Sequence, residues 1–209
     1  DFFDFFRLGP SRYGLAIADV SGKGVPASLL MAIGQTTLRY LAKGGEAPAE
    51  AFILLNRELN ERMREDMFIT AIYGIIDLKE NTFTFARAGH ELPLIIRAGT
   101  GESKPKAEYL ESEGLALGMV PDELFEEVIV NCVTPFDSGD FLVLFTDGIT
   151  EAADLDDEQF STDRLASFAQ KSFGKSPKQF NEELLKKLHD FAGDALRADD
   201  ITLITARRK

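Results

Sequence analysis

Two apolar segments of the chain, residues 15–18 and 141–146, are each followed directly by an aspartate. These aspartates are Asp19 and Asp147, and glycine stands close behind both of them. A buried strand that ends in this way delivers a carboxylate to the rim of a core. Because burying an unpaired carboxylate is costly and packing does not require one there, the chain must fold so that these charges are compensated.

The same arrangement recurs at both ends of the chain, where Asp1 precedes the first apolar segment and Asp199 the last. None of these aspartates has a cationic neighbour in the sequence, which suggests a shared divalent cation. Hard ions such as Mg²⁺ and Mn²⁺ prefer oxygen ligands, and the backbone carbonyl of Val20 could add one. A single Asp-Gly pair after a strand is more often a plain turn, so the hypothesis depends on the conjunction of Asp1, Asp19, Asp147 and Asp199.

The composition narrows the class of protein. The chain has 209 residues, a net charge of −12 and 44% hydrophobic residues, which is typical of one folded domain with a good core. The negative charge argues against nucleic-acid binding and against anionic membranes. No segment reaches the roughly 18 apolar residues of a membrane span. The single cysteine, Cys132, excludes an internal disulfide and fits a cytoplasmic setting.

Hydrophobic periodicity and turn residues predict strands and helices in separate blocks. Strands are expected at residues 1–6, 13–18, 68–77, 82–88, 92–97, 125–133, 141–146 and 201–206. Helices are expected at residues 26–43, 47–64, 162–170 and 177–193, and residues 98–124 are expected to be rich in loops. Strands linked by hairpins favour an α+β fold with a largely antiparallel sheet. We expect residues 1–209 to form a single domain and, since the first residue is Asp1 and not Met, to be the C-terminal part of a longer protein.

Five sequence segments, taken in order, resemble the SpoIIE/RsbU-type branch of the metal-dependent PPM (type 2C) serine/threonine protein phosphatases. They are residues 1–4 (DFFD), 18–27 (ADVSGKGVPA), 88–94 (AGHELPL), 144–152 (LFTDGITEA) and 198–203 (ADDITL). The resemblance covers almost the whole chain. It implies an αββα sandwich of two mainly antiparallel sheets flanked by helices, with a centre for two Mn²⁺ or Mg²⁺ ions.

The resemblance also implies roles for single residues. Asp19 would bridge the metals, with the Val20 carbonyl beside it, and Asp1, Asp147 and Asp199 would complete the ligand set, Asp19 and Asp147 being the main catalytic residues. Lys23 is a candidate for substrate contact, although an exposed loop lysine is an equally good interpretation. Animal type 2C enzymes carry a histidine, proposed as general acid, where this chain has Ser21, so the acid is unassigned.

The branch implies a substrate and partners. These enzymes usually remove phosphate from phosphoserine or phosphothreonine on a small STAS-domain protein, an anti-anti-sigma factor. Many are driven by an upstream sensor or regulatory domain, and in some the helices expected here at residues 26–43 and 47–64 act as the switch. A homodimer is left open. The alternative is a catalytically weak or silent module that binds a partner and regulates signalling.

Two further residues stand out less. His90, in the Ala-Gly-His segment, is predicted to shape a turn between two strands, since hard metal sites prefer oxygen ligands. Thr70, on the strand expected at residues 68–77, is predicted to pack internally.

Overall fold

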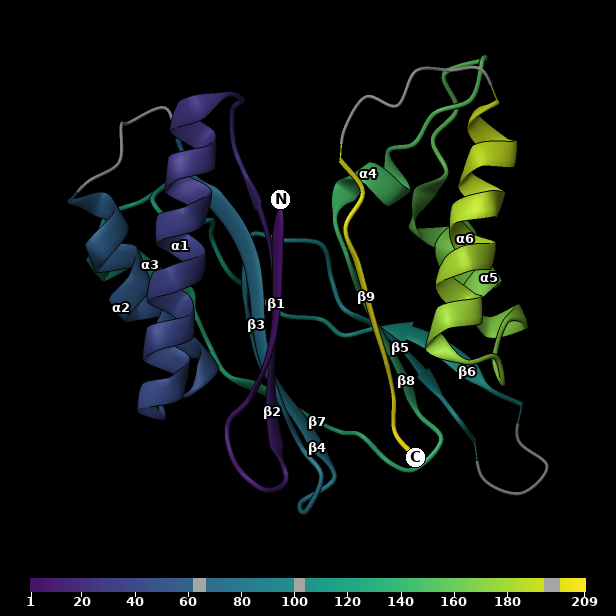
Figure 1. Ribbon diagram of the computed structural model, residues 1–209, viewed down its shortest axis with the longest axis horizontal. Helices are drawn as coiled ribbons and strands as arrows, with labels where there is room; N and C mark the ends of the chain where they lie inside the picture. The colour runs from purple at the N-terminus through teal and green to yellow at the C-terminus, as the bar shows by residue number, and fades with distance from the viewer. Residues whose placement is uncertain (62–66, 100–103, 194–199) are drawn as a thin grey trace. The chain divides into compact units, whose positions relative to one another are not determined.

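The computed structural model describes residues 1–61, 67–99, 104–193 and 200–209. The chain divides into two compact units. The first unit comprises Asp1–His90 and Ser112–Phe136, and the second comprises Glu91–Glu111 and Asp137–Lys209. Each unit contains one antiparallel sheet with helices packed against it (Figure 1). The prediction of an α+β chain with two mainly antiparallel sheets is confirmed, whereas the assignment of residues 1–209 to one domain stays a prediction.

The first unit has a five-stranded sheet in the order β1-β2-β3-β4-β7. Its strands are β1 (Phe2–Arg7), β2 (Arg12–Val20), β3 (Ile69–Asp77), β4 (Thr82–Ala88) and β7 (Cys132–Pro135). Its helices are α1 (Val25–Gly44), α2 (Pro48–Asn60) and α3 (Asp122–Val128). The sheet is a meander from β1 to β4, so each of these strands pairs with its neighbour in sequence.

The core of the first unit lies between α1, α2 and one face of this sheet. Leu38 of α1 and Phe52 of α2 are buried against alternate residues of the strands, such as Phe2 and Phe6. Gly34 lets α1 approach the sheet, because a Cβ there would stand 3.1 Å from the Ile69 side chain. Since strand side chains alternate between faces, the residues between these core positions project from the opposite face.

Tyr73, at the centre of this core, provides a test of the packing. Its side chain is fully buried near the rings of Phe6 and Phe52, and its hydroxyl has no hydrogen-bond partner among the described residues. Burial raises the pKa of Tyr73 to about 12. An unsatisfied buried hydroxyl costs about 1–3 kcal/mol, so Tyr73→Phe should raise the free energy of unfolding by about 1 kcal/mol.

The matched control for Tyr73→Phe is Tyr109→Phe. The Tyr109 hydroxyl donates a 2.7 Å hydrogen bond to the Thr162 carbonyl, so its removal should lower the free energy of unfolding. Urea denaturation followed by fluorescence and circular dichroism measures both variants. Destabilisation by Tyr73→Phe would show that the hydroxyl has a partner after all.

The second unit has a four-stranded sheet in the order β6-β5-β8-β9. The strands are β5 (Leu94–Arg97), β6 (Lys106–Tyr109), β8 (Phe141–Phe145) and β9 (Leu203–Arg207), and the helices are α4 (Asp147–Thr150), α5 (Ser161–Lys171) and α6 (Pro177–Ala192). Helices α5 and α6 pack on the sheet with Phe160, directly before α5, and with Phe180 and Leu184 of α6, all in one core with Phe141 and Val143 of β8. Ser176 starts α6 with a capping box that it forms with Gln179.

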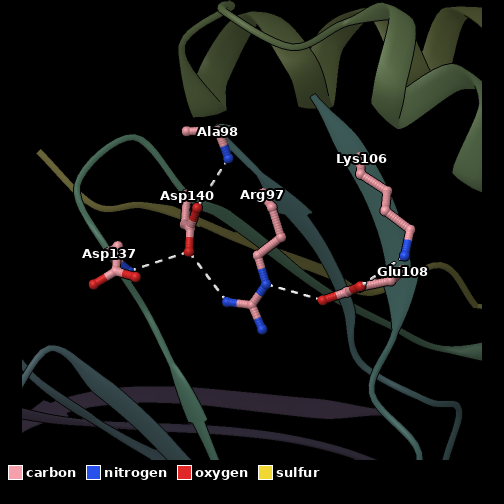
Figure 2. Close-up of polar contacts among 6 residues, drawn as sticks. All are labelled: Arg97, Ala98, Lys106, Glu108, Asp137 and Asp140. Carbon is pink, nitrogen blue, oxygen red and sulfur yellow. Dashed lines mark hydrogen bonds and ion pairs between the residues drawn. The ribbon is translucent and has the colours of Figure 1, made fainter. Parts of the chain in front are cut away.

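A polar network fixes the beginning of β8 (Figure 2). The buried Asp140 carboxylate accepts hydrogen bonds from Arg97 Nη1 at 3.1 Å and from the Ala98 and Asp137 amides at 2.9 and 3.1 Å. Arg97 Nε also donates to Glu108 on β6 at 2.9 Å, and this bond lowers the pKa of Glu108. The network therefore secures β5, β6 and the start of β8 at one end of the sheet, and β8 leads to Asp147 at the other.

The structure corrects one predicted strand. Residues 125–131 are not a strand, because α3 runs over Asp122–Val128 and β7 begins only at Cys132. Asp122 and Glu123 in the first turn favour a helix start, and the Asp122 carboxylate accepts hydrogen bonds from Asn56 and Asn60. Moreover, β7 pairs with β4 in the first sheet while β8 belongs to the second, so these two consecutive strands do not pair with each other.

Two smaller differences concern residues 98–124 and the helices. The segment expected to be loop-rich contains β6, a short edge strand that pairs with β5. Helix α2 is described as far as Asn60, and residues 62–64 of the predicted helix lie outside the described residues. No helix within the described ranges combines the length and the apolarity needed to cross a lipid bilayer.

Candidate metal centre

Asp19 stands at the end of β2, where it pairs with Thr70 of β3 across an antiparallel ladder. Its side chain is half-buried. The chain after Asp19 is tied down at Ser21, whose hydroxyl accepts a 2.7 Å hydrogen bond from the Phe68 amide and whose own amide donates to the Phe68 carbonyl at 3.0 Å. Ser21 therefore holds the loop that follows the candidate ligand.

Glycine is required in this loop. Gly22 and Gly24 have φ angles of 85° and 77°, a left-handed conformation that other residues rarely adopt. This conformation turns the chain from β2 into α1.

Asp1 lies at the same end of the first sheet as Asp19. The register pairs Phe2 of β1 with Ala18 of β2, so the next residues outward on these neighbouring strands are Asp1 and Asp19. Asp1 is half-buried. Asp1, before β1, and Asp19, in β2, are separated by the β1–β2 hairpin in sequence. These two predicted ligands nevertheless lie at the same end of the first sheet.

Val20 and Lys23 occupy different environments. The Val20 side chain is buried in the core beneath the helices, which fixes the backbone beside Asp19. Lys23 is exposed in the loop that leads to α1. The roles predicted for the Val20 carbonyl and for Lys23 stay predictions.

In the second unit, β8 delivers Asp147 to the beginning of α4, and the chain before β9 returns to the same place. The Thr146 amide donates to the Thr202 carbonyl at 3.1 Å, and the Thr202 amide donates to Thr146 Oγ1 at 3.0 Å. A Cβ at Gly148 would lie 2.1 Å from the Asp200 carbonyl oxygen. Gly148 thus allows the backbone of Asp200 to pass directly over the residue next to Asp147.

Asp199 lies outside the described residues, and its neighbour Asp200 is exposed at the start of the described C-terminal segment. Within the described ranges, no three Asp, Glu, His or Cys side chains form a group that could hold an ion. The structure therefore gathers the predicted ligands by unit: Asp1 with Asp19 in the first, and Asp147 with the Asp200 backbone in the second.

The structure also brings together Thr70 and His90, for which no metal-binding role is predicted from the sequence. Thr70, the cross-strand partner of Asp19, has its Oγ1 atom 2.9 Å from Nδ1 of His90. His90 is only 5% exposed. The Ala-Gly-His segment singles out His90 in the sequence. The structure adds that His90 contacts Thr70, which in turn pairs with the candidate ligand Asp19 across the β2–β3 ladder.

The donor set fits hard divalent cations. The half-buried Asp19 side chain forms no ion pair with any Lys or Arg that the structure describes. Carboxylate oxygens of this kind suit Mg²⁺ and Mn²⁺ better than softer metals. The close passage of Asp200 over Gly148 is a second feature that fits, because it brings the backbone next to Asp199 toward Asp147.

Comparison with known proteins extends these observations. Residues 9–209 match the family model of stage II sporulation protein E (SpoIIE). Over its whole length the chain is 32% identical to phosphoserine phosphatase RsbU of Bacillus subtilis, of which it covers 59%. It is also 27% identical to protein IcfG of Synechocystis and covers 36% of that protein, so the chain spans only part of the relatives it matches.

Solved structures show the same fold. The whole chain superposes on the SiaA-PP2C domain of Pseudomonas aeruginosa with a TM-score of 0.83 at 19% identity, covering 80% of that chain. It superposes on the RsbU and RsbW domains of Rv1364c from Mycobacterium tuberculosis with a TM-score of 0.81 at 26% identity, covering 55% of that chain. The chain therefore has the PP2C fold and belongs to the SpoIIE family, as its sequence motifs predicted.

Proposed function

We propose that this chain is a metal-dependent protein phosphatase that hydrolyses phosphoserine or phosphothreonine on a partner protein. The observation that carries the proposal is the placement of Asp1, Asp19 and Asp147 at the ends of strands in a chain of the SpoIIE family. The 32% identity to a phosphoserine phosphatase supports the same reaction class.

We assign the metal ligands to Asp1, Asp19, Asp147, Asp199 and the Val20 carbonyl. When bound, two divalent cations would lower the pKa of an attacking water molecule and neutralise charge on the phosphoryl oxygens. The protein's part is to present fixed carboxylates: Ser21 secures the loop after Asp19, and Gly148 admits the Asp200 backbone beside Asp147. The chemistry requires no covalent phospho-enzyme. The leaving serine oxygen would be protonated by a further water molecule or by a group of the substrate.

For the substrate, we propose a small phosphorylated STAS-domain protein of the anti-anti-sigma class. The relatives RsbU and RsbP of Bacillus subtilis are both named phosphoserine phosphatases, which supports phosphoserine as the group that is hydrolysed. A cytoplasmic location and control by a sensor or regulatory domain upstream belong to the same proposal.

Metal removal tests this function. The chain is treated with EDTA, dialysed, and assayed on an aryl phosphate and on a phosphorylated STAS-domain protein, with and without added Mn²⁺ or Mg²⁺. Turnover should fall to background without metal and return when metal is added, because the water and the phosphoryl group lose their electrostatic partner.

Two results would contradict the proposal. Full turnover after chelation would exclude the metal-dependent mechanism. Absence of turnover on both substrates with Mn²⁺ present, together with tight binding of the STAS-domain protein, would favour the alternative of a silent regulatory module.

A further inference from the structure

The candidate ligand Asp19 has a polar neighbour that is itself held in place. Thr70 faces Asp19 across the β2–β3 ladder, and Thr70 Oγ1 is 2.9 Å from His90 Nδ1. All three residues belong to the first unit. The arrangement is therefore independent of how the two units are placed.

Asp19 and Thr70 project from the same face of the sheet. Ala18 and Val20, the neighbours of Asp19, are buried in the core beneath α1 and α2, and so are Ile69 and Ala71, the neighbours of Thr70. Since side chains alternate along a strand, both Asp19 and Thr70 point to the opposite face. Directly paired residues have Cβ atoms about 4.5–5.5 Å apart, so Thr70 and Asp19 are neighbours on that face. The hydrogen bond of Thr70 Oγ1 in the structure is the one to His90, and no hydrogen bond joins Thr70 to Asp19.

His90 is fixed by its own backbone. Gly89 forms a bridge with Ala71, directly after Thr70, and has a φ angle of 66°. A Cβ at Gly89 would stand 2.9 Å from the Ala116 amide nitrogen, so the segment is closely packed there. Arg87 Nη1 donates to the His90 carbonyl at 2.8 Å. His90 is thus a buried residue on a closely packed segment, with its imidazole against Thr70.

We propose that His90, acting through Thr70, is a positioning residue for Asp19. In this arrangement the Nδ1–H group of His90 donates to Thr70 Oγ1, which leaves the threonine proton for the Asp19 carboxylate. A carboxylate held in this way is oriented before a cation binds, and removing such an outer partner typically weakens metal affinity about 10–100-fold. This inference rests on the proposed function, because it assumes that Asp19 is a metal ligand.

Thr70→Val tests the proposal, because valine keeps the shape of threonine and removes the hydroxyl. Isothermal titration calorimetry should show Mn²⁺ affinity lowered about 10–100-fold, with the loss of activity largely recovered at saturating Mn²⁺. Thr70→Ser keeps the hydroxyl and should bind Mn²⁺ like the wild type. Thr84→Val, at a half-buried position on β4, is the matched control and should also leave Mn²⁺ affinity unchanged.

A second pair of variants separates positioning from general stability. His90→Leu removes the imidazole and should weaken Mn²⁺ binding as Thr70→Val does, whereas His90→Asn keeps a donor near the Nδ1 position and should restore it. His90 is proposed to act only through Thr70, so the losses should not add. The Mn²⁺ affinity of the Thr70→Val/His90→Leu double variant should therefore be no lower than that of the single variant with the lower affinity. This pair also tests the proposal if Thr70→Val itself fails to fold.

The outcomes distinguish this inference from the proposed function. Wild-type Mn²⁺ affinity in Thr70→Val and His90→Leu, in a protein that binds Mn²⁺ and turns over phosphoprotein, would overturn the positioning role alone. Additive losses in the double variant would also overturn it. Failure of the wild-type chain to bind Mn²⁺ would overturn the inference together with the proposed metal site.

Discussion

Asp19→Asn should abolish phosphatase activity and leave the fold intact. Asparagine has the shape of aspartate but lacks the charge that a bridging ligand needs, so we expect turnover to fall by roughly 10³-fold or more. The half-buried Asp19 forms no ion pair with a described Lys or Arg, so its neutralisation should not lower stability. Activity on a phosphorylated STAS-domain protein and thermal unfolding without metal are the measurements.

The control for this variant lies at the other end of the same strand pair. Asp77 ends β3 opposite Arg12, and its Oδ1 atom accepts hydrogen bonds from the Lys79 and Glu80 amides in a turn. Asp77→Asn should therefore keep full activity. Mn²⁺ should raise the unfolding temperature of the wild type and of Asp77→Asn, because a ligand that binds only the folded state stabilises it, but not that of Asp19→Asn. Activity of Asp19→Asn comparable to that of the wild type would remove Asp19 from the mechanism.

Gly148→Ala should damage both stability and metal binding. The added Cβ would lie 2.1 Å from the Asp200 carbonyl oxygen and 3.0 Å from its carbonyl carbon, and backbone cannot move away as a flexible side chain can. Two residues from Gly148 and from Asp200, the hydrogen bonds between Thr146 and Thr202 hold the two segments together, so the strain cannot be relieved locally. We expect a loss of about 1–3 kcal/mol in the free energy of unfolding.

The second expected effect of Gly148→Ala is on the metal centre. Displacing Asp200 also displaces the adjoining backbone, on which the proposed ligand Asp199 depends, so Mn²⁺ affinity should fall. Gly44→Ala is the control, because a Cβ at that end of α1 meets nothing within 4 Å and alanine favours a helix. Wild-type unfolding and Mn²⁺ affinity in Gly148→Ala would show that the close passage of Asp200 is not needed.

The sequence predicted most of the architecture where hydrophobic periodicity was strong. Strands β1, β2, β3, β4 and β8 and helices α1, α5 and α6 lie within a few residues of their predicted places. The error at residues 125–133 arose because the apolar residues of this segment were read as one strand. The segment instead contains the end of a short acidic helix, α3, and the beginning of the edge strand β7. Strand β6 was missed because Lys106–Tyr109 is short and polar, and only its pairing with β5 makes it a strand.

The candidate ligands are predicted from the sequence, whereas their surroundings are seen only in the structure. An aspartate after an apolar run is visible in the sequence, and so is the glycine beside Asp147. By contrast, the neighbourhood of Thr70, His90 and Asp19 follows from strand register and from a bridge between β3 and Gly89, neither of which leaves a local pattern. The reason for Gly148 is likewise a contact with Asp200, which lies far away in sequence.

Anomalous diffraction from crystals of this chain grown with Mn²⁺ would locate the metal ions. If the proposed centre is correct, two strong manganese peaks should lie about 3.5–4 Å apart, with carboxylate oxygens of Asp19, Asp147 and Asp199 as ligands. The proposed metal centre would be wrong if manganese were absent from these residues. It would also be wrong if the carboxylates of Asp19 and Asp147 lay too far apart to share a pair of metal ions.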